Sequence, residues 1–161
     1  MKNRSRTVLG IDPGDVFSGL VEWDGARIIH AMRIENKEAL HVLMNTRCTD
    51  VAIEEIVLWG KGGKNISGAI KWSGRFEQAA EFMGLSVHSL YRKTIAAHLT
   101  GLAKYGDTKI RAALIERFGP PPSKGCDNPV YNGCKIPGKK NDKWAAWAVA
   151  VTWWDKNCGG W

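Results

Sequence analysis

The chain has 161 residues, of which 44% are hydrophobic and 24% are charged. This composition is that of a globular protein with a sizeable core, and it excludes a disordered or fibrous chain. The formal net charge of +7 favours a polyanionic partner, because clustered Lys and Arg neutralise phosphates and release counterions. No run approaches the roughly 18 apolar residues of a membrane span, and no signal peptide is evident, so we expect a cytoplasmic protein without membrane contact.

The hydrophobic pattern predicts alternating strands and helices. Strand-like composition and alternation mark five segments, residues 6–12, 17–23, 26–34, 50–58 and 85–91. Helical spacing of apolar residues marks a second set, residues 35–47, 66–83, 92–99, 108–118 and 141–156. Asp24-Gly25 is typical of a tight hairpin, so we expect the first three strands to form an antiparallel meander.

Turn and cap residues bound several of these elements. Gly84 suits the end of the second helix, Asp107 can cap the fourth, and Gly119 with the prolines after it ends that fourth helix. Residues 119–140 then form a loop. The chain shows neither an internal repeat nor a linker. We therefore expect residues 1–161 to form a single α/β domain with a mixed sheet covered by helices.

Three acidic residues lie where apolar structure starts or stops. Asp12 ends the first strand, Glu54 lies in the fourth strand, and Asp142 lies in the first turn of the last helix. If the two strands are neighbours and the helix crosses their ends, the three carboxylates converge as hard oxygen ligands that suit magnesium. Each residue also has a structural alternative, as a turn former, an edge-strand charge or a favourable anion in a helix's first turn.

The order of the sequence motifs resembles a known family. VLGIDPG is followed by VAIEE, then by GAIKWSGRFEQAAEFMGLSV, DTKIRAALIERFG and DKWAAWAVAVT. In this order, and over nearly the whole chain, the motifs resemble the RuvC family of Holliday junction resolvases in the RNase H-like superfamily. The resemblance implies an RNase H-like mixed five-stranded sheet, with three antiparallel strands and then parallel additions, flanked by helices.

The resemblance also implies an activity. Asp12, Glu54 and Asp142 would be the catalytic residues and would bind Mg²⁺, with Mn²⁺ as a substitute. The protein would be an endodeoxyribonuclease that resolves four-way DNA junctions by paired nicking, as a homodimer, through two-metal phosphodiester hydrolysis. The alternatives are a branched-DNA nuclease acting on flaps or forks, and a catalytically weak junction-binding protein.

The sequence departs from the family pattern at one ligand position. The family usually offers two metal-binding positions one turn apart in the closing helix, and here Ala145 stands at the second. Asp155 cannot replace it, because thirteen residues along a helix turn the side chain roughly 220° away from Asp142. Neighbouring strand residues point to opposite faces, so only one of Glu54 and Glu55 can face the site, and the match to VAIE favours Glu54.

Candidate DNA contacts flank the acids. Trp59 follows the fourth strand and is predicted to stack on a base, with core packing as the alternative. Lysines in the following loop and before the last helix suit a phosphate backbone, and one near the acids would stabilise the charged transition state. The full set of predicted DNA-binding residues is Trp59, Lys61, Lys64, Lys93, Lys104, Lys109, Lys139, Lys140 and Lys143.

Two other residue types receive structural interpretations. Trp144, Trp147 and Trp154 fall on one face of the last helix, which favours a core or dimer contact over a nucleic-acid platform. Cys126 and Cys134 lack the spacing of a zinc site, so we expect reduced thiols and no zinc.

Overall fold

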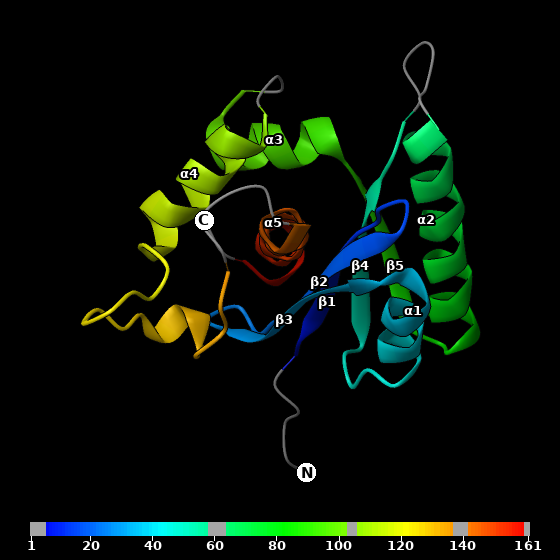
Figure 1. Cartoon of the computed structure of the whole chain (residues 1–161), viewed down its shortest axis with the longest axis horizontal. Helices are drawn as coiled ribbons and strands as arrows, with labels where there is room; N and C mark the ends of the chain where they lie inside the picture. The colour runs from blue at the N-terminus through cyan, green and yellow to red at the C-terminus, as the bar shows by residue number, and fades with distance from the viewer. Residues whose placement is uncertain (1–5, 58–63, 103–105, 137–141, 160–161) are drawn as a thin grey trace.

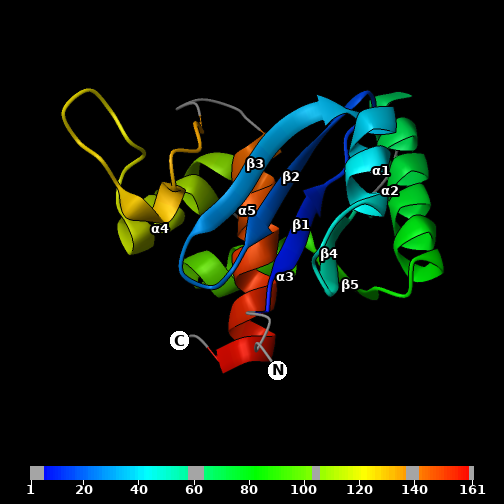
Figure 2. The same cartoon turned by 90° about the horizontal axis from the view of Figure 1, so that it is seen from below.

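The computed structural model describes residues 6–57, 64–102, 106–136 and 142–159. Its strands are β1 (Val8–Asp12), β2 (Phe17–Trp23), β3 (Ile28–Glu35), β4 (Asp50–Glu55) and β5 (Ser86–Tyr91). They form one sheet in the order β3-β2-β1-β4-β5 (Figure 2). β1, β2 and β3 pair antiparallel, whereas β4 and β5 are added in parallel. The expected mixed sheet is therefore confirmed.

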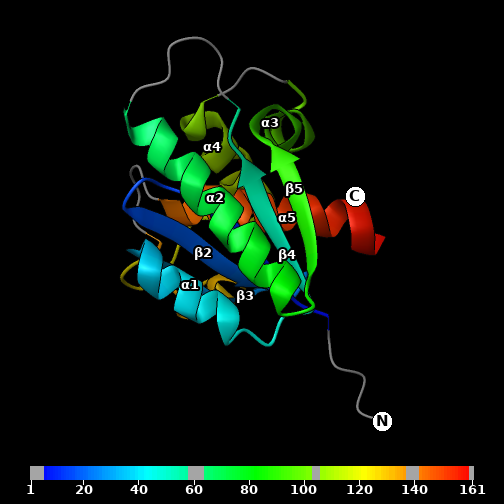
Figure 3. The ribbon, with the colours of Figure 1, turned by 90° about the vertical axis from the view of Figure 1, so that its right-hand side faces the viewer.

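Helices cover both faces of the sheet. The described helices are α1 (Asn36–Met44), α2 (Lys64–Phe82), α3 (Arg92–Thr100), α4 (Asp107–Phe118) and α5 (Asp142–Trp154). α1 and α2 lie on one face, and α5 crosses the other face with α3 and α4 beside it (Figure 1, Figure 3). None of these helices is both long and apolar enough to cross a membrane.

Two short segments differ from the sequence prediction. The predicted loop over 119–140 contains a 3₁₀ turn, Pro129–Tyr131, where the Asn128 side chain accepts a hydrogen bond from the Val130 amide. The chain also continues past α5 in a π-helical turn, Asp155–Gly159. Both turns pack beside α5 or the sheet, and neither changes the predicted fold class.

Strand alternation divides the apolar residues between two cores. Leu9 and Ile11 of β1 face α1 and α2, where they pack with Leu43 and Phe76. Val8 of β1 belongs to the second core, which includes Trp23 and the buried face of α5 with Trp144, Trp147 and Val149. Trp144 and Trp147 are buried, so the predicted core role of these two tryptophans is confirmed.

Two glycines let α5 approach the sheet closely. A Cβ on Gly10 of β1 would clash with the backbone of Ala146 and the side chain of Ala150. A Cβ on Gly19 of β2 would clash with the backbone of Asp142. Because Gly10 and Gly19 have no side chains, the backbone of α5 can lie closer to the strands than larger residues would allow. As a result, the first turn of α5 lies directly on β2.

Asp107 does not cap α4 as expected. The N-cap residue is Gly106, no side chain caps the helix there, and Asp107 is the first helical residue. Its carboxylate instead forms an ion pair with Arg92, the first residue of α3. A charged partner across the α3–α4 junction competes successfully with the helix amides, because a charge-assisted contact is stronger than a neutral one.

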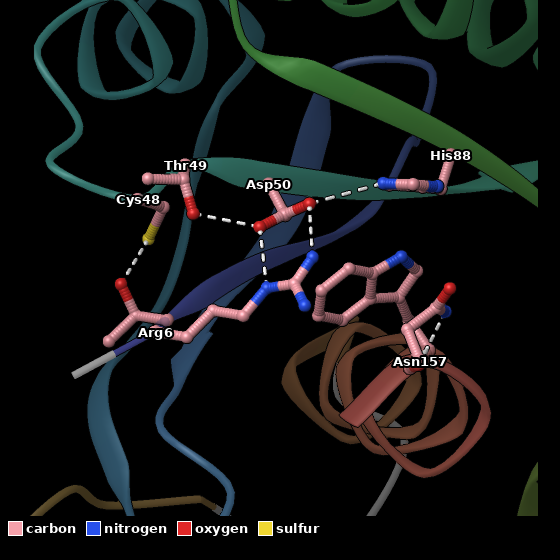
Figure 4. Close-up of polar contacts among 8 residues, drawn as sticks. Arg6, Cys48, Thr49, Asp50, His88 and Asn157 are labelled. Carbon is pink, nitrogen blue, oxygen red and sulfur yellow. Dashed lines mark hydrogen bonds and ion pairs between the residues drawn. The ribbon is translucent and has the colours of Figure 1, made fainter. Parts of the chain in front are cut away.

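A polar cluster joins the amino ends of β1, β4 and β5 (Figure 4). Asp50 accepts hydrogen bonds from Arg6 at 3.1 and 3.2 Å and from the Thr49 hydroxyl at 2.7 Å. The His88 ring lies 3.3 Å from the same carboxylate. Burial raises the pKa of Asp50, but these hydrogen bonds outweigh it, and the net pKa is lowered. Asp50 is therefore held as a charged structural residue.

Candidate metal centre

The three predicted acids meet at the opposite end of the sheet. Gly10 faces α5, and Asp12 lies two residues further along β1, so strand alternation directs it to the same face. Glu54 faces α5 for the same reason, two residues beyond Ala52. β1 and β4 are parallel neighbours, which brings the ends that carry Asp12 and Glu54 side by side.

Asp142 reaches the same place through the close packing of α5. Gly19 pairs with Asp12 across the β1–β2 ladder, and the backbone of Asp142 lies over Gly19. The charges of Glu54 and Asp142 both act on Asp12 strongly enough to raise its pKa. These three residues, far apart in the sequence, therefore lie at the same end of the sheet.

Asp12 is the least satisfied of the three acids. Its pKa is raised well above the ordinary value of 3.8, first by burial, then by the charges of Glu54 and Asp142, while Arg92 lowers it. Within the described part of the chain, no hydrogen bond to its carboxylate is present. A desolvated carboxylate in this state is stabilised by a bound cation.

Two arginines bind the other acids. Arg92 Nη1 lies 3.0 Å from Glu54 Oε2, and burial raises the pKa of Glu54 even though Arg92 opposes the shift. Arg33 Nε donates to Asp142 Oδ2 at 2.8 Å, and the Arg33 guanidinium lies over the Phe17 ring at 4.4 Å. Sequence reasoning missed both arginines. The available signal was position, since Arg33 pairs with Gly19 in the sheet and Arg92 directly follows β5.

The carboxylate oxygens of the three acids suit a divalent cation, but in the structure Glu54 and Asp142 are paired with Arg92 and Arg33. Among the described residues, no three His, Cys, Asp or Glu side chains stand close enough together to hold a metal ion. The three carboxylates are nevertheless hard oxygen donors, and Asp12 is a half-buried acceptor that receives no hydrogen bond from the described residues. Glu54 and Asp142 would join Asp12 around an ion by turning from their arginines.

A cleft of about 300 Å³ opens over this group. Its lining includes Asp12, Asp142 and Ala145, together with Arg92 and Asp107 from the α3–α4 side. The methyl group of Ala145 therefore faces the cleft where the family resemblance implied a second ligand. The side chain at this position of the cleft offers no donor atom.

A buried network supports the segment after Asp12. The Ser18 hydroxyl donates to Asn36 Oδ1 at 2.6 Å and accepts from the Gly14 amide at 3.2 Å. Asn36 Nδ2 donates to the carbonyl oxygens of Gly14 and Asp15, each at 3.0 Å. These bonds fix the turn that leaves β1 and so fix the direction of Asp12. Sequence reasoning missed Ser18 and Asn36, whose residue types carry no signal of this role.

The predicted DNA-binding residues are only partly described. Trp59, Lys61, Lys104, Lys139 and Lys140 lie outside the described residues, as does the side chain of Lys64. Lys93 lies 5.9 Å from the Tyr91 ring centroid, Lys109 is exposed on α4, and Lys143 donates to the Lys135 carbonyl at 3.1 Å. The described cations that line the cleft are Arg92 and Arg111, and none of these three lysines does.

The two neighbouring glutamates of β4 differ in how far they are buried. Glu54 is only 8% exposed and carries the ion pair with Arg92. Glu55 is half-buried at the end of the strand, on the alternate side. The position of Glu54 is the one expected for a site residue.

Comparison with known proteins identifies the fold. No protein-family model and no curated protein sequence matches the chain. The sheet order, with three antiparallel strands and two parallel additions crossed by α5, is RNase H-like. Two solved structures of Thermus thermophilus RuvC match the chain. One is a RuvC structure that matches at TM-score 0.66 with 19% identity, over 95% of this chain and 96% of that chain. The other is T. thermophilus RuvC in complex with a Holliday junction substrate, at TM-score 0.65 with 18% identity over 91% and 92%. The chain therefore has the fold of a RuvC resolvase.

Proposed function

We propose that the protein is a magnesium-dependent, structure-selective endodeoxyribonuclease that resolves four-way DNA junctions by paired nicking. The observation that carries the proposal is that Asp12, Glu54 and Asp142 lie at one end of the sheet, where Asp12 lines a cleft and receives no hydrogen bond from the described residues. The RuvC-like fold supports the same assignment, since one of the matching structures is a complex with a Holliday junction substrate. Manganese is expected to substitute for magnesium.

The residues of this chain would have distinct roles in hydrolysis. Asp12 would hold the centre of the site, with Glu54 and Asp142 on either side. Divalent metal bound there would supply an activated water and stabilise the charge on the attacking and leaving oxygens. Arg92 and Arg111 line the cleft, where a guanidinium can contact a phosphate. The tight packing of α5 on Gly19 would keep Asp142 in register with Asp12.

DNA contact is proposed for the basic residues around the site. Lys93, Lys109 and Lys143 lie on α3, α4 and α5, the elements that border the cleft. Trp59, Lys61, Lys64, Lys104, Lys139 and Lys140 remain predicted contacts, with Trp59 as a base-stacking residue. A homodimer would place two such sites on one junction, so that two strands are nicked.

The direct test uses a labelled synthetic four-way junction, a fork, a flap and a linear duplex of matched sequence. Each is incubated with the protein in Mg²⁺, Mn²⁺ or EDTA, alongside Asp12→Asn and a Glu116→Gln control on the exposed face of α4. We expect symmetric, metal-dependent nicks in the junction that vanish in Asp12→Asn and persist in Glu116→Gln. Cleavage of forks or flaps in preference to the junction would contradict the resolvase assignment and indicate a branched-DNA nuclease.

A junction-binding protein is the second candidate function. It is favoured by Ala145, which offers no ligand, and by the ion pairs that Arg33 and Arg92 make with Asp142 and Glu54. Such a protein would bind the junction equally well in EDTA and in Mg²⁺. It would produce no nicks in either metal, even at stoichiometric protein.

A further inference from the structure

We propose that Asp107 supplies a further carboxylate to the metal centre, in the place that Ala145 leaves open. The inference rests on the proposed metal-dependent nuclease and names an additional ligand of the same site. Asp107 is separated from Asp12 by most of the chain and belongs to a different helix from Asp142. Only the folded structure brings it to the cleft.

Asp107 is placed where it can reach the metal centre. It begins α4 and lines the same cleft as Asp12, Asp142 and Ala145. Its side chain is 70% exposed, so it can move without disturbing the core. No side chain caps α4, and the Asp107 carboxylate pairs with Arg92 instead of with its own helix.

Asp107 already binds a cationic side chain that also contacts a site acid. The Arg92 guanidinium is paired with both Glu54 and Asp107. These two carboxylates are thus close enough to share one positive group, although they come from β4 and α4. A divalent cation placed beside Asp12 would meet both of them in competition with Arg92, because carboxylate oxygens serve a guanidinium and a hard metal ion alike.

Asp12 supports the same placement independently of the ion pairs. It is half-buried and lines the cleft, and no hydrogen bond from the described residues reaches its carboxylate. An acceptor in this state favours a cation bound in the cleft. Ala145 cannot help to hold that cation, whereas Asp107, across the cleft, can.

The proposal predicts opposite effects for Asp107 and Arg92. Removal of the Asp107 charge deletes a ligand and weakens cation binding. Removal of the Arg92 charge deletes a competitor and strengthens it. If Asp107 served only to hold Arg92 in place, both substitutions would change cation binding in the same direction.

The test measures metal binding directly, without DNA or cleavage. Terbium(III) is the probe, because it prefers oxygen ligands and is excited by a nearby tryptophan, and Trp144 lines the cleft. Its luminescence is titrated and then displaced by Mg²⁺, in the wild type, Asp107→Asn, Arg92→Gln, Asp12→Asn and the Glu116→Gln control. Circular dichroism verifies that each variant is folded.

We expect Asp107→Asn to weaken binding about tenfold, since the charge count of the ligands sets the affinity of such sites. Arg92→Gln should strengthen it, and Glu116→Gln should leave it unchanged. Adding Ala145→Asp to Asp107→Asn should restore affinity by returning a carboxylate to the cleft. Unchanged affinity in Asp107→Asn, with loss in Asp12→Asn, would overturn the proposal for Asp107.

The outcome separates this inference from the nuclease proposal. If junctions are cleaved and Asp107→Asn neither weakens terbium binding nor slows cleavage, the nuclease stands and the role of Asp107 is refuted. If Asp107→Asn and Asp12→Asn both weaken binding while no branched DNA is cut, the ligand role stands and the nuclease proposal fails.

Discussion

Asp50 and Glu54 occupy opposite ends of the same face of β4, and their environments differ sharply. Both are buried, at 3% and 8% exposure, so burial alone does not distinguish them. Asp50 receives hydrogen bonds from Arg6 and Thr49 and contacts His88, and its pKa is lowered (Figure 4). Glu54 has one arginine, which it shares with Asp107, and its pKa is raised.

The difference in hydrogen bonding separates a structural acid, Asp50, from the acids at the carboxyl end of the sheet, which have fewer donors. At the amino end of the sheet, several donors converge on one carboxylate and keep it charged. At the carboxyl end, Asp12, Glu54 and Asp142 share two arginines, and Asp12 has no hydrogen bond among the described residues. Concentrated negative charge costs stability in the folded protein and favours cation binding, which is the usual property of a functional site.

Gly19→Ala is expected to lower both cleavage and stability, because it changes the carboxyl end of the sheet alone. The added methyl group would meet the backbone of Asp142 and push the start of α5 from β2. Misplacing a ligand by about 1 Å is expected to slow cleavage about 100-fold. Overpacking should also cost about 1–3 kcal/mol of unfolding free energy. Junction cleavage and urea unfolding measure the two effects.

Gly74→Ala is the matched control for this change. Gly74 lies inside α2, and nothing stands within 4 Å of where its Cβ would be. Alanine there should raise stability by about 0.5–1 kcal/mol, because it improves helix propensity without a clash. Full cleavage activity in Gly19→Ala would show that the close approach of α5 does not position Asp142.

Asp50→Asn disrupts the polar cluster at the amino end of the sheet and is expected to leave the candidate metal centre intact. The substitution removes the charge that binds Arg6 and His88. Arg6 is half exposed, so water replaces part of the lost interaction, and we expect a loss of about 1–3 kcal/mol. Denaturant unfolding measures it. Cleavage per folded molecule should equal that of the wild type, and a loss of metal affinity would contradict the independence of the two ends.

Asp12→Asn should stabilise the metal-free protein while abolishing cleavage. Asparagine keeps the shape of the side chain and removes a desolvated charge that Glu54 and Asp142 repel. A gain of about 1 kcal/mol would raise Tm by about 2–4 °C for a chain of this length. Thermal unfolding in EDTA provides the measurement. A lower Tm would mean that the Asp12 carboxylate already has a stabilising partner in the folded protein.

Sequence reasoning recovered most of the fold because its signals are local. The alternation of β1 and β4, the helical spacing of α2 and the glycine after α2 each act within a few residues. All five predicted strands lie in the sheet, with boundaries shifted by a few residues. The hairpin at Asp24-Gly25 is also present, with the Asp24 side chain accepting from the Ala26 and Arg27 amides.

The site was predicted less completely, because its partners are set by tertiary structure. The acids could be found from motifs, but Arg33 and Arg92 act across the sheet and carry no motif. Asp107 is a normal capping residue in sequence, and only the nearby Arg92 redirects it. Asp155, which helix geometry predicts to point away from Asp142, contacts Arg117 and His98 in the structure.

The smallest expected effect is a difference in the pH dependence of stability between the two ends. The folded pKa of Asp12 is raised, so its ionisation weakens the fold as pH rises above the ordinary value of 3.8 and through the folded pKa. The folded pKa of Asp50 is lowered, so its contribution is present above 3.8 and is lost as pH falls through the folded pKa. Asp12→Asn should therefore reduce the decline on the alkaline side of the profile, and Asp50→Asn should reduce the decline on the acid side. Urea unfolding in EDTA from about pH 3 to about pH 8 measures both slopes. If the two variants changed the same side of the profile, the contrast between a satisfied and an unsatisfied acid would be wrong, since opposite pKa shifts must act on opposite sides.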